Sequence, residues 1–455
     1  MLLTEKEARA ATDKMLSFVT AEDAVVSVGS EIYSHLRFAA NSFQTSGRRE
    51  NVSATVAVWK DAGGAAGGRK RGAASANGVD VASLREAVAE AERVAALSPP
   101  DREYLPSLGP QTYKPTQGFA EATADISPEA RAKFVGDIIT ECERAKVVGA
   151  GFHQARGAAG ATATKNGNFA YERVSNVSLS MTTRTPAGDS SGYFLRSHFD
   201  VARLDPLRIA RESIRRALEG RNARALDPGA YTVILEPQAV ADLLNFGFAF
   251  DARNAEEGRS AYSAPDGKTR RGQKIFDERL NIYSDPWNPE LPGSQAAQAG
   301  LPAEKIFLVR AGVLETLVYS RFWAQKRNER PTPGPVNIIM ESAAPAASVE
   351  EMIRSTERGL LVSRFWYIRG IDPRRAASTG LTRDGVWLIE GGQIKHAVKN
   401  FRFNQSMTEM LAPGNVEMIG KPERVGSSEG GGAGASLMPA LKVKKFNFTS
   451  QSEAV

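Results

Sequence analysis

The stretch from Val233 to Phe250 constrains the fold most, because it reads as a buried strand followed at once by a helix. The strand ends at Leu235, and the helix begins at Pro237, where a missing N–H costs nothing in the first turn. One face of this helix is apolar and consists of Ala239, Val240, Leu243, Leu244 and Phe246. This unit indicates a chain that mixes helices with sheets.

The chain has 455 residues, of which 42% are hydrophobic and 24% are charged. This length predicts two or three domains rather than one core. No run of about 18 apolar residues exists, so we expect no transmembrane helix. The N-terminus lacks a signal-peptide pattern, and its Thr4 and Glu7 are spaced as a helix capping box. The single cysteine, Cys142, cannot form an internal disulfide, which is typical of a reducing compartment. We therefore expect a cytoplasmic protein.

The net charge of +6 raises the question of nucleic-acid binding. The clearest basic cluster is Arg69-Lys70-Arg71, inside a Gly/Ala-rich stretch at 61–78 that we expect to be a mobile loop. A nucleic-acid surface usually carries a basic stripe with interleaved aromatic residues, and no such stripe is visible. The basic residues therefore indicate a solvated surface and no nucleic-acid partner.

The first 225 residues predict an N-terminal α/β domain. Helices are expected at 5–19, 81–97, 128–148 and 206–220, and strands at 24–29, 37–43, 52–59, 149–158, 169–173 and 177–183. The segment 221–229 is polar and rich in turn residues, so we place a domain boundary there.

Residues 226–455 predict a β-rich domain of sandwich or barrel type. Residues 308–314 and 388–394 each read as strand, glycine-containing turn and strand, and each is followed by an extended run, at 318–323 and 398–403. Two similar hairpins favour a pseudo-symmetric β structure, and chance similarity of the two hairpins is the alternative. Residues 439–448 alternate like a final strand.

The residues alone predict no self-sufficient active site. The four histidines are distant from one another in the sequence: His35, His153, His198 and His396. Cys142 falls on the apolar face of its predicted helix, where a cysteine is an inert small hydrophobe.

Several segments together resemble one known family. In the second half they are Arg358–Val362, Phe365-Trp366, Thr379–Gly385, Trp387–Ile394 and Val398–Asn404, and in the first half Arg37–Ser42. They resemble the TldD/PmbA family of metallopeptidase-related proteins over nearly the whole chain. The resemblance implies an α/β N-terminal domain, a β-rich C-terminal domain, and dimers that enclose a central cavity. In the metal-binding members, two His and a late Cys hold zinc, and a Glu acts as the base.

This chain departs from the metal-binding pattern at each position. Pro237 stands at the first His position, Gln238 at the Glu position and Asp242 at the second His position. The Cys would lie in the Gly-rich segment 427–435, which contains only Ser, Glu, Gly and Ala. Proline has no donor atom, Gln is not a general base, and one carboxylate does not hold a metal. The sequence therefore predicts no metal and no catalytic residue in this chain.

The resemblance implies a TldE-like, non-catalytic subunit of a heterodimeric zinc peptidase that acts on unfolded peptides. Zinc is then expected in a TldD-like partner, and this chain alone is expected to be inactive. Two alternatives stay open: a homodimeric peptide-binding protein of the same fold, and a metal-independent hydrolase. Arg383, Asp384 and Asn404 are candidates for cavity or interface contacts, because strand-end loops often carry such groups. A purely structural role in turns and hairpins explains these three residues equally well.

Overall fold

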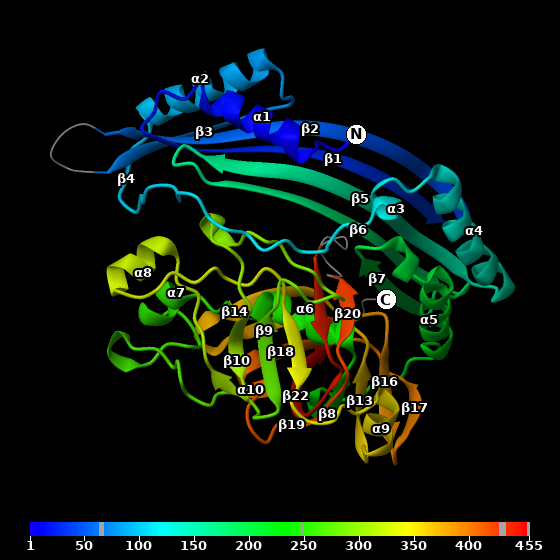
Figure 1. Ribbon diagram of the computed structural model, residues 1–455. Coiled ribbons are helices and arrows are strands. Elements are labelled where there is room, and N and C mark those ends of the chain that lie inside the picture. The colour runs from blue at the N-terminus through cyan, green and yellow to red at the C-terminus, as the bar shows by residue number, and fades with distance from the viewer. Residues whose placement is uncertain (63–67, 248, 427–433, 453–455) are drawn as a thin grey trace.

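The computed structural model describes the chain apart from residues 63–67, 248, 427–433 and 453–455 (Figure 1). Helices and strands of the first half are α1 (Glu5–Leu16), β1 (Asp23–Ala39), β2 (Ser42–Asp61), β3 (Arg69–Ala76), α2 (Val81–Leu97), β4 (Pro100–Asp101), α3 (Glu121–Ala124), α4 (Pro128–Arg144), β5 (Val148–Thr164), β6 (Phe169–Arg184), β7 (Ser191–His198) and α5 (Pro206–Glu219).

The strands of the first half form one seven-stranded sheet in the order β4-β3-β2-β1-β5-β6-β7. Alternate residues of β1 are buried, and Val26 and Val28 pack in a core with α1 and α2. Further along the same face, Leu36 and Phe38 pack in a core with α4 and α5. The helices therefore cover one face of the sheet. A strap of residues 102–120 runs along the other face, between the sheet and the second half of the chain (Figure 1).

The strands are longer than the sequence predicted. β1 continues through residues 30–36, so the separate strands expected at 24–29 and 37–43 were wrong in leaving a gap. The chain then reverses at Ala40 and Asn41, which have φ of 50° and 55°. The strands expected at 169–173 and 177–183 are likewise one strand, β6, and β7 was not predicted. Helices α1, α2, α4 and α5 confirm the predicted helices to within a few residues, and the Thr4–Glu7 capping box is present.

The mobile loop expected at 61–78 was wrong for its second part, because Arg69–Ala76 is strand β3, paired with β2. Its small residues serve a close contact with α2. A Cβ at Gly72 would lie 1.9 Å from the carbonyl oxygen of Ala91 and 2.4 Å from the amide nitrogen of Ala95. The glycine lets the helix lie directly on the strand. Residues 63–67 lie outside the described part of the chain.

The second half supplies the remaining helices and strands. They are β8 (Gly229–Leu235), α6 (Pro237–Gly247), α7 (Ala252–Glu256), β9 (Leu280–Ser284), β10 (Ile306–Arg310), β11 (Val313–Leu314), α8 (Arg321–Arg327), β12 (Ile339–Ser342), α9 (Val349–Arg354), β13 (Arg358–Val362), β14 (Phe365–Asp372), β15 (Ala377–Thr382), β16 (Val386–Glu390), β17 (Gln393–Ala397), β18 (Phe401–Ser406), α10 (Met407–Met410), β19 (Val416–Ile419), β20 (Glu423–Gly426), β21 (Ala435–Met438) and β22 (Leu441–Gln451).

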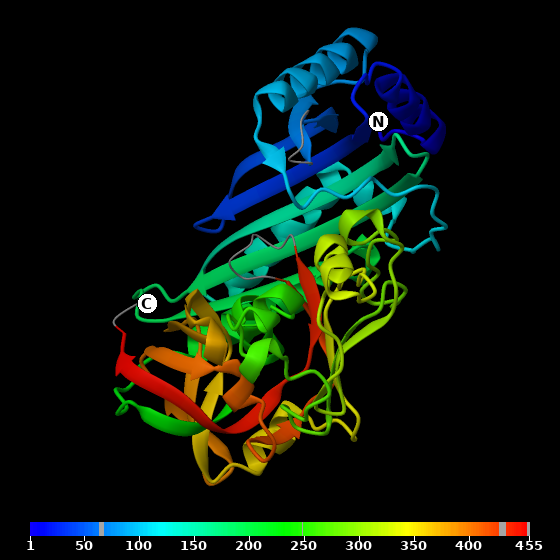
Figure 2. The same ribbon diagram turned by 90° about the vertical axis from the view of Figure 1, so that its left-hand side faces the viewer.

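These strands form two sheets, which confirms a mixed α+β protein with a β-rich second half. The six-stranded sheet has the order β11-β10-β9-β12-β21-β20. The nine-stranded sheet has the order β14-β15-β18-β22-β8-β13-β16-β17, with β19 paired to β22. Both sheets and α6 contribute side chains to one hydrophobic cluster. Figure 2 shows this β-rich body below the long strands of the seven-stranded sheet.

Both predicted hairpins are present, as β10–β11 and β16–β17. They lie in different sheets. The extended run expected at 318–323 was wrong, because Ser320 caps helix α8 by accepting a hydrogen bond from the amide of Trp323. The run at 398–403 leads into strand β18, and residues 439–448 lead into β22. No helix in the described part of the chain is long and apolar enough to cross a membrane.

Candidate functional site

Helix α6 is placed by the centre of the nine-stranded sheet. Strand β8 lies between β22 and β13, and Val233 and Leu235 are fully buried. The amide of Glu236 donates to the carbonyl oxygen of Val362 at 3.0 Å, so α6 begins directly beside β13. Ala239, Val240 and Leu243 are fully buried and Leu244 is 7% exposed, which confirms these members of the predicted apolar face; the side chain of Phe246 lies outside the described part of the chain.

Gln238 and Asp242 share a face of α6 and are hydrogen-bonded to each other. Both are buried, with 6% and 4% of their surface exposed. The Nε2 of Gln238 donates to Asp242 Oδ1 and to the carbonyl oxygen of Gly426, each at 2.9 Å. The amide of Phe365 donates to Asp242 Oδ2 at 3.1 Å. The two side chains thus join α6 to β14 and β20 by hydrogen bonds.

A second buried pair consists of Arg364, next to Phe365 in the sequence, and Asp384. The guanidinium of Arg364 contacts Asp384 Oδ2 at 2.9 Å, and both side chains are about 5% exposed or less. Ser191 of β7 donates its hydroxyl to Asp384 Oδ1. Asp384 has a φ of 56°, a left-handed conformation that Asp tolerates better than most residues. This pair therefore connects the seven-stranded sheet to the nine-stranded sheet.

Tyr193 packs on the Arg364–Asp384 pair. The guanidinium of Arg364 lies 3.8 Å from the centre of the Tyr193 ring. Burial raises the pKa of the Tyr193 phenol above its usual value, opposed by the charge of Arg364. Arg216 of α5 donates to the carbonyl oxygen of Tyr193 at 2.9 Å and pairs with Glu236 at 2.7 Å. We call Gln238, Asp242, Arg364, Asp384, Tyr193 and Ser191 the α6 cluster.

A cavity of about 450 Å³ reaches the α6 cluster at Tyr193. Its other lining residues come from β1, β5 and β6 and include Phe38, Phe152, Ser180, Met181 and Thr182. The cavity has hydroxyl groups and aromatic rings on its wall. The guanidinium of Arg364, which pairs with Asp384, packs on the Tyr193 ring.

The structure brings together two of the three candidate contact residues. Asp384 is in the α6 cluster, and half-buried Arg383 lies beside it, with Nε 3.8 Å from Asp384 Oδ2. Asn404 is exposed on β18, and its carbonyl oxygen accepts from the Nδ2 of Asn447. Within the described part of the chain, no hydrogen bond joins Asn404 to the α6 cluster.

The sequence analysis missed Arg364, Tyr193 and Ser191. Arg364 had a usable signal, because it is a charged residue between the buried strand β13 and the buried Phe365. A buried charge needs a partner, and that partner is Asp384. Tyr193 and Ser191 lie on the unpredicted strand β7, far from α6 in sequence.

The residues that the resemblance assigns to the zinc-motif positions do not suit zinc. Pro237 offers no ligand atom, Gln238 donates its amide to Asp242, and Asp242 already accepts from two N–H groups. Among the described residues, no group of three or more His, Cys, Asp or Glu is placed to hold a metal ion. Residues 427–433 of the Gly-rich segment lie outside that part of the chain.

Comparison with known proteins identifies a family that the sequence matches. Residues 228–450 match the model of the PmbA/TldA metallopeptidase C-terminal domain. The chain belongs to the PmbA/TldD metallopeptidase family. A protein of Archaeoglobus fulgidus described as a metalloprotease is 24% identical over 203 residues. That match covers 44% of this chain and 43% of the relative, so it spans less than half the length of the relative.

The fold of this PmbA/TldD family member is similar to three solved structures. TldE from Thermococcus kodakarensis is 18% identical, with a TM-score of 0.82 over 97% of this chain and 99% of that one. A putative modulator of DNA gyrase from Thermotoga maritima is 15% identical, with a TM-score of 0.81 over 97% and 100%. A protein of Bacteroides thetaiotaomicron with the same description is 17% identical, with a TM-score of 0.80 over 98% and 99%. The chain has a TldE-like fold.

Proposed function

We propose that this chain is the metal-free, non-catalytic subunit of a TldD/TldE-type heterodimeric zinc metallopeptidase that degrades or processes unfolded peptides. The observation that carries the proposal is the Gln238–Asp242 hydrogen bond, at the positions that the resemblance assigns to a base and a ligand in metal-binding members. A partner subunit would supply zinc, and this chain would shape the cavity around the partner's active site.

The chemistry of the chain's own residues supports an inactive subunit. Zinc lowers the pKa of a bound water to about 7, and a lone buried carboxylate such as Asp242 does not. Cys142 is fully buried, and burial raises the pKa of its thiol to about 11, so it is not a thiolate nucleophile at neutral pH. The metal-independent hydrolase therefore has less support than an inactive subunit.

Surface contacts of the basic cluster argue against a nucleic-acid partner. In the basic cluster, Arg69 pairs with Glu22 at 3.1 Å, and Lys70 donates to the carbonyl oxygen of Ala96 at 3.2 Å. Arg71 lies 5.8 Å from the ring centre of Trp59. These side chains are engaged within the chain. We place both subunits in the cytoplasm, because one buried cysteine suits a reducing compartment.

Reconstitution tests the proposal. The purified chain is assayed on an unstructured peptide alone, with a metal-binding homologue from the same source, and with that homologue after chelation. We expect activity only in the untreated mixture and a complex containing both chains. Chelator-resistant activity of this chain alone would support the metal-independent hydrolase.

The same experiment separates the homodimeric alternative. A chain that forms a dimer by itself, binds the peptide and gains nothing from the homologue is a peptide-binding protein rather than a peptidase subunit.

A further inference from the structure

A groove of about 1400 Å³ lies between the seven-stranded sheet and the strap, and its lining residues differ from those of the α6 cluster. Its floor is the sheet face opposite the helices. Its other walls come from the strap, from residues 294–300 and from the start of α8. Figures 1 and 2 both show the strap running along this face of the sheet.

The centre of the floor has no side chains on two neighbouring strands. One row across the sheet consists of Ser53, Gly29, Gly160 and Glu172, on β2, β1, β5 and β6. This row points into the groove, because Val28 beside Gly29 packs under the helices. Bare backbone at this point makes a trough with Ser53 at one end and Glu172 at the other.

Close packing requires glycine at Gly160 but not at Gly29. A Cβ at Gly160 would lie 2.8 Å from the carbonyl oxygen of Val28, so glycine is needed there. A Cβ at Gly29 would meet nothing closer than the carbonyl oxygen of Ala159 at 3.9 Å. Glycine inside a strand costs stability, and nothing in the folded chain requires it at Gly29. The open space above Gly29 belongs to the groove.

Glu172 is a half-buried carboxylate without a cationic partner. It accepts a hydrogen bond from the hydroxyl of Ser294 at 2.5 Å, and no Arg or Lys lies within ion-pair distance in the described part of the chain. By contrast, Glu31 in the same groove pairs with Arg49 and Arg156. Burial raises the pKa of Glu172, because the ionised carboxylate is poorly solvated there. A cation placed beside it would relieve that cost.

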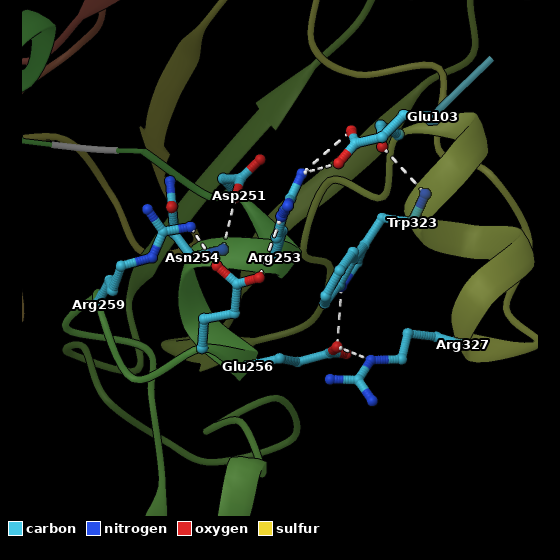
Figure 3. Close-up of polar contacts among 10 residues, drawn as sticks. Glu103, Asp251, Arg253, Asn254, Glu256, Arg259, Trp323 and Arg327 are labelled. Atoms are coloured by element: carbon cyan, nitrogen blue, oxygen red, sulfur yellow. Dashed lines mark hydrogen bonds and ion pairs between the residues drawn. The ribbon is translucent and has the colours of Figure 1, made fainter. Parts of the chain in front are cut away.

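Polar contacts with α7 hold the parts of the strap and of α8 that line the groove (Figure 3). Arg253 of α7 donates to both carboxylate oxygens of Glu103 in the strap, at 2.9 and 3.1 Å. Glu256 of α7 accepts from the indole Nε1 of Trp323 at 2.9 Å and from Arg327 at 2.6 Å, which holds α8 in place. A wall that is already ordered loses little freedom when it binds a ligand.

We propose that this groove binds an extended peptide segment and that a lysine or arginine side chain of the segment pairs with Glu172. The rings of Tyr104, Tyr113 and Phe322 also line the groove. The groove is larger than the roughly 300–1000 Å³ of ordinary small-molecule pockets. The choice of a peptide as the ligand rests on the proposed function, whereas the choice of a cationic side chain follows from Glu172 alone.

Binding of two neutral-ended peptides to the purified chain tests the proposal. The probes are N-acetylated, C-amidated Ala-Ala-Lys-Ala-Ala and its twin with Gln in place of Lys, measured by titration calorimetry. We expect the Lys peptide to bind at least about tenfold more tightly than its twin, as one charge-assisted hydrogen bond provides. The Glu172→Gln variant should remove that difference, and Gly29→Val should weaken both peptides by filling the trough.

Three controls make the outcome decisive. Glu121→Gln, which changes an exposed carboxylate outside the groove lining, should leave both affinities unchanged, and the thermal midpoint of each variant reports whether it folds. n-Butylammonium carries the cation without a peptide and should bind at least about tenfold more weakly than the Lys peptide. Equal affinity for the two peptides, full binding by Glu172→Gln, or equal binding of n-butylammonium would overturn the proposal. None of these results depends on a partner subunit, so the reconstitution experiment remains an independent test.

Discussion

Gln238 donates its side-chain amide to Asp242 across one turn of α6, at 2.9 Å, and both residues are buried. The amide N–H of Gln238 and the carboxylate of Asp242 form a donor–acceptor pair, whereas two ligands and a base would need a metal between them. These hydrogen bonds explain how the fold tolerates a buried carboxylate next to β14 and β20. Replacing Gln238 or Asp242 alone is therefore expected to lower the stability of the chain.

Gln238→Glu should give no peptidase activity and should destabilise the chain by about 2–4 kcal/mol. The new carboxylate would face Asp242 Oδ1 and the carbonyl oxygen of Gly426 without a proton to donate. Chemical unfolding at pH 7 and pH 5 measures the effect, which should be smaller at pH 5, where the pair can share a proton. The double variant with Asp242→Asn should recover part of the loss. Chelator-sensitive activity in Gln238→Glu would reveal a zinc site built from other residues.

The purified chain should contain no stoichiometric zinc. Pro237, Gln238 and Asp242 offer one carboxylate where a zinc site needs three or four donors, and that carboxylate already accepts two hydrogen bonds. Elemental analysis after dialysis, without a chelator, is the measurement. About one zinc per chain, lost in Asp242→Ala, would contradict this expectation.

Asp384→Ala should destabilise the chain by about 3–5 kcal/mol, because it leaves the buried guanidinium of Arg364 without its carboxylate. Asp384→Asn should cost less, since Asn tolerates the φ of 56° and still accepts from Ser191. Denaturant unfolding of the two variants compares them. An Asn variant as unstable as the Ala variant would show that the charge of Asp384 matters more than its hydrogen bonds and backbone conformation.

His153 should make the chain less stable as the pH falls from 6.5 to 4. Burial, aided by the charge of Arg131, lowers the pKa of its imidazole to about 4, whereas the unfolded chain has the ordinary value of 6.5. Above pH 6.5 both states are neutral. Below it the unfolded state takes up a proton first, so the free energy of unfolding decreases by up to about 3 kcal/mol and levels off below pH 4.

The His153→Leu variant isolates this effect. His198 has a pKa lowered in the same direction, so the informative quantity is the difference between wild type and His153→Leu at each pH. That difference should shift in favour of the variant between pH 7 and pH 4.5. A constant difference over this range would mean that His153 titrates alike in both states.

Gly72→Ala should destabilise the chain by about 1–3 kcal/mol, because the added methyl group would meet the backbone of α2 at Ala91 and Ala95. Gly136→Ala on α4 is the matched control. A Cβ at Gly136 meets nothing within 4 Å, so that change should stabilise the helix by about 0.5–1 kcal/mol. Thermal unfolding of both variants measures the contrast.

The sequence predicted elements whose signals are local. Helices such as α4 and α6 carry a proline in the first turn and a repeating apolar face, and the hairpins carry glycine at their turns. Strand β3 was mistaken for a loop because its small residues look unable to pack. Their value appears only when α2 lies against Gly72, and that contact is between distant segments.

The candidate site was predictable only in part for the same reason. Gln238 and Asp242 lie four residues apart on one helix, so their shared face followed from helical periodicity. The partners of Asp384 are Arg364, twenty positions earlier, and Ser191, on a strand of the other half of the chain. Such pairings depend on sheet order, which one sequence does not reveal.

The central place of β8 in its sheet has a consequence for synthesis. β8 is the first strand of the second half, yet one of its two neighbours is β22, and the hydroxyl of Thr232 reaches the carbonyl oxygen of Lys444, 212 positions later. A growing chain therefore carries β8 and β18 with uncovered edges until β22 has left the ribosome. During that interval these edges are templates for wrong pairing, and a chaperone would have a defined surface to protect.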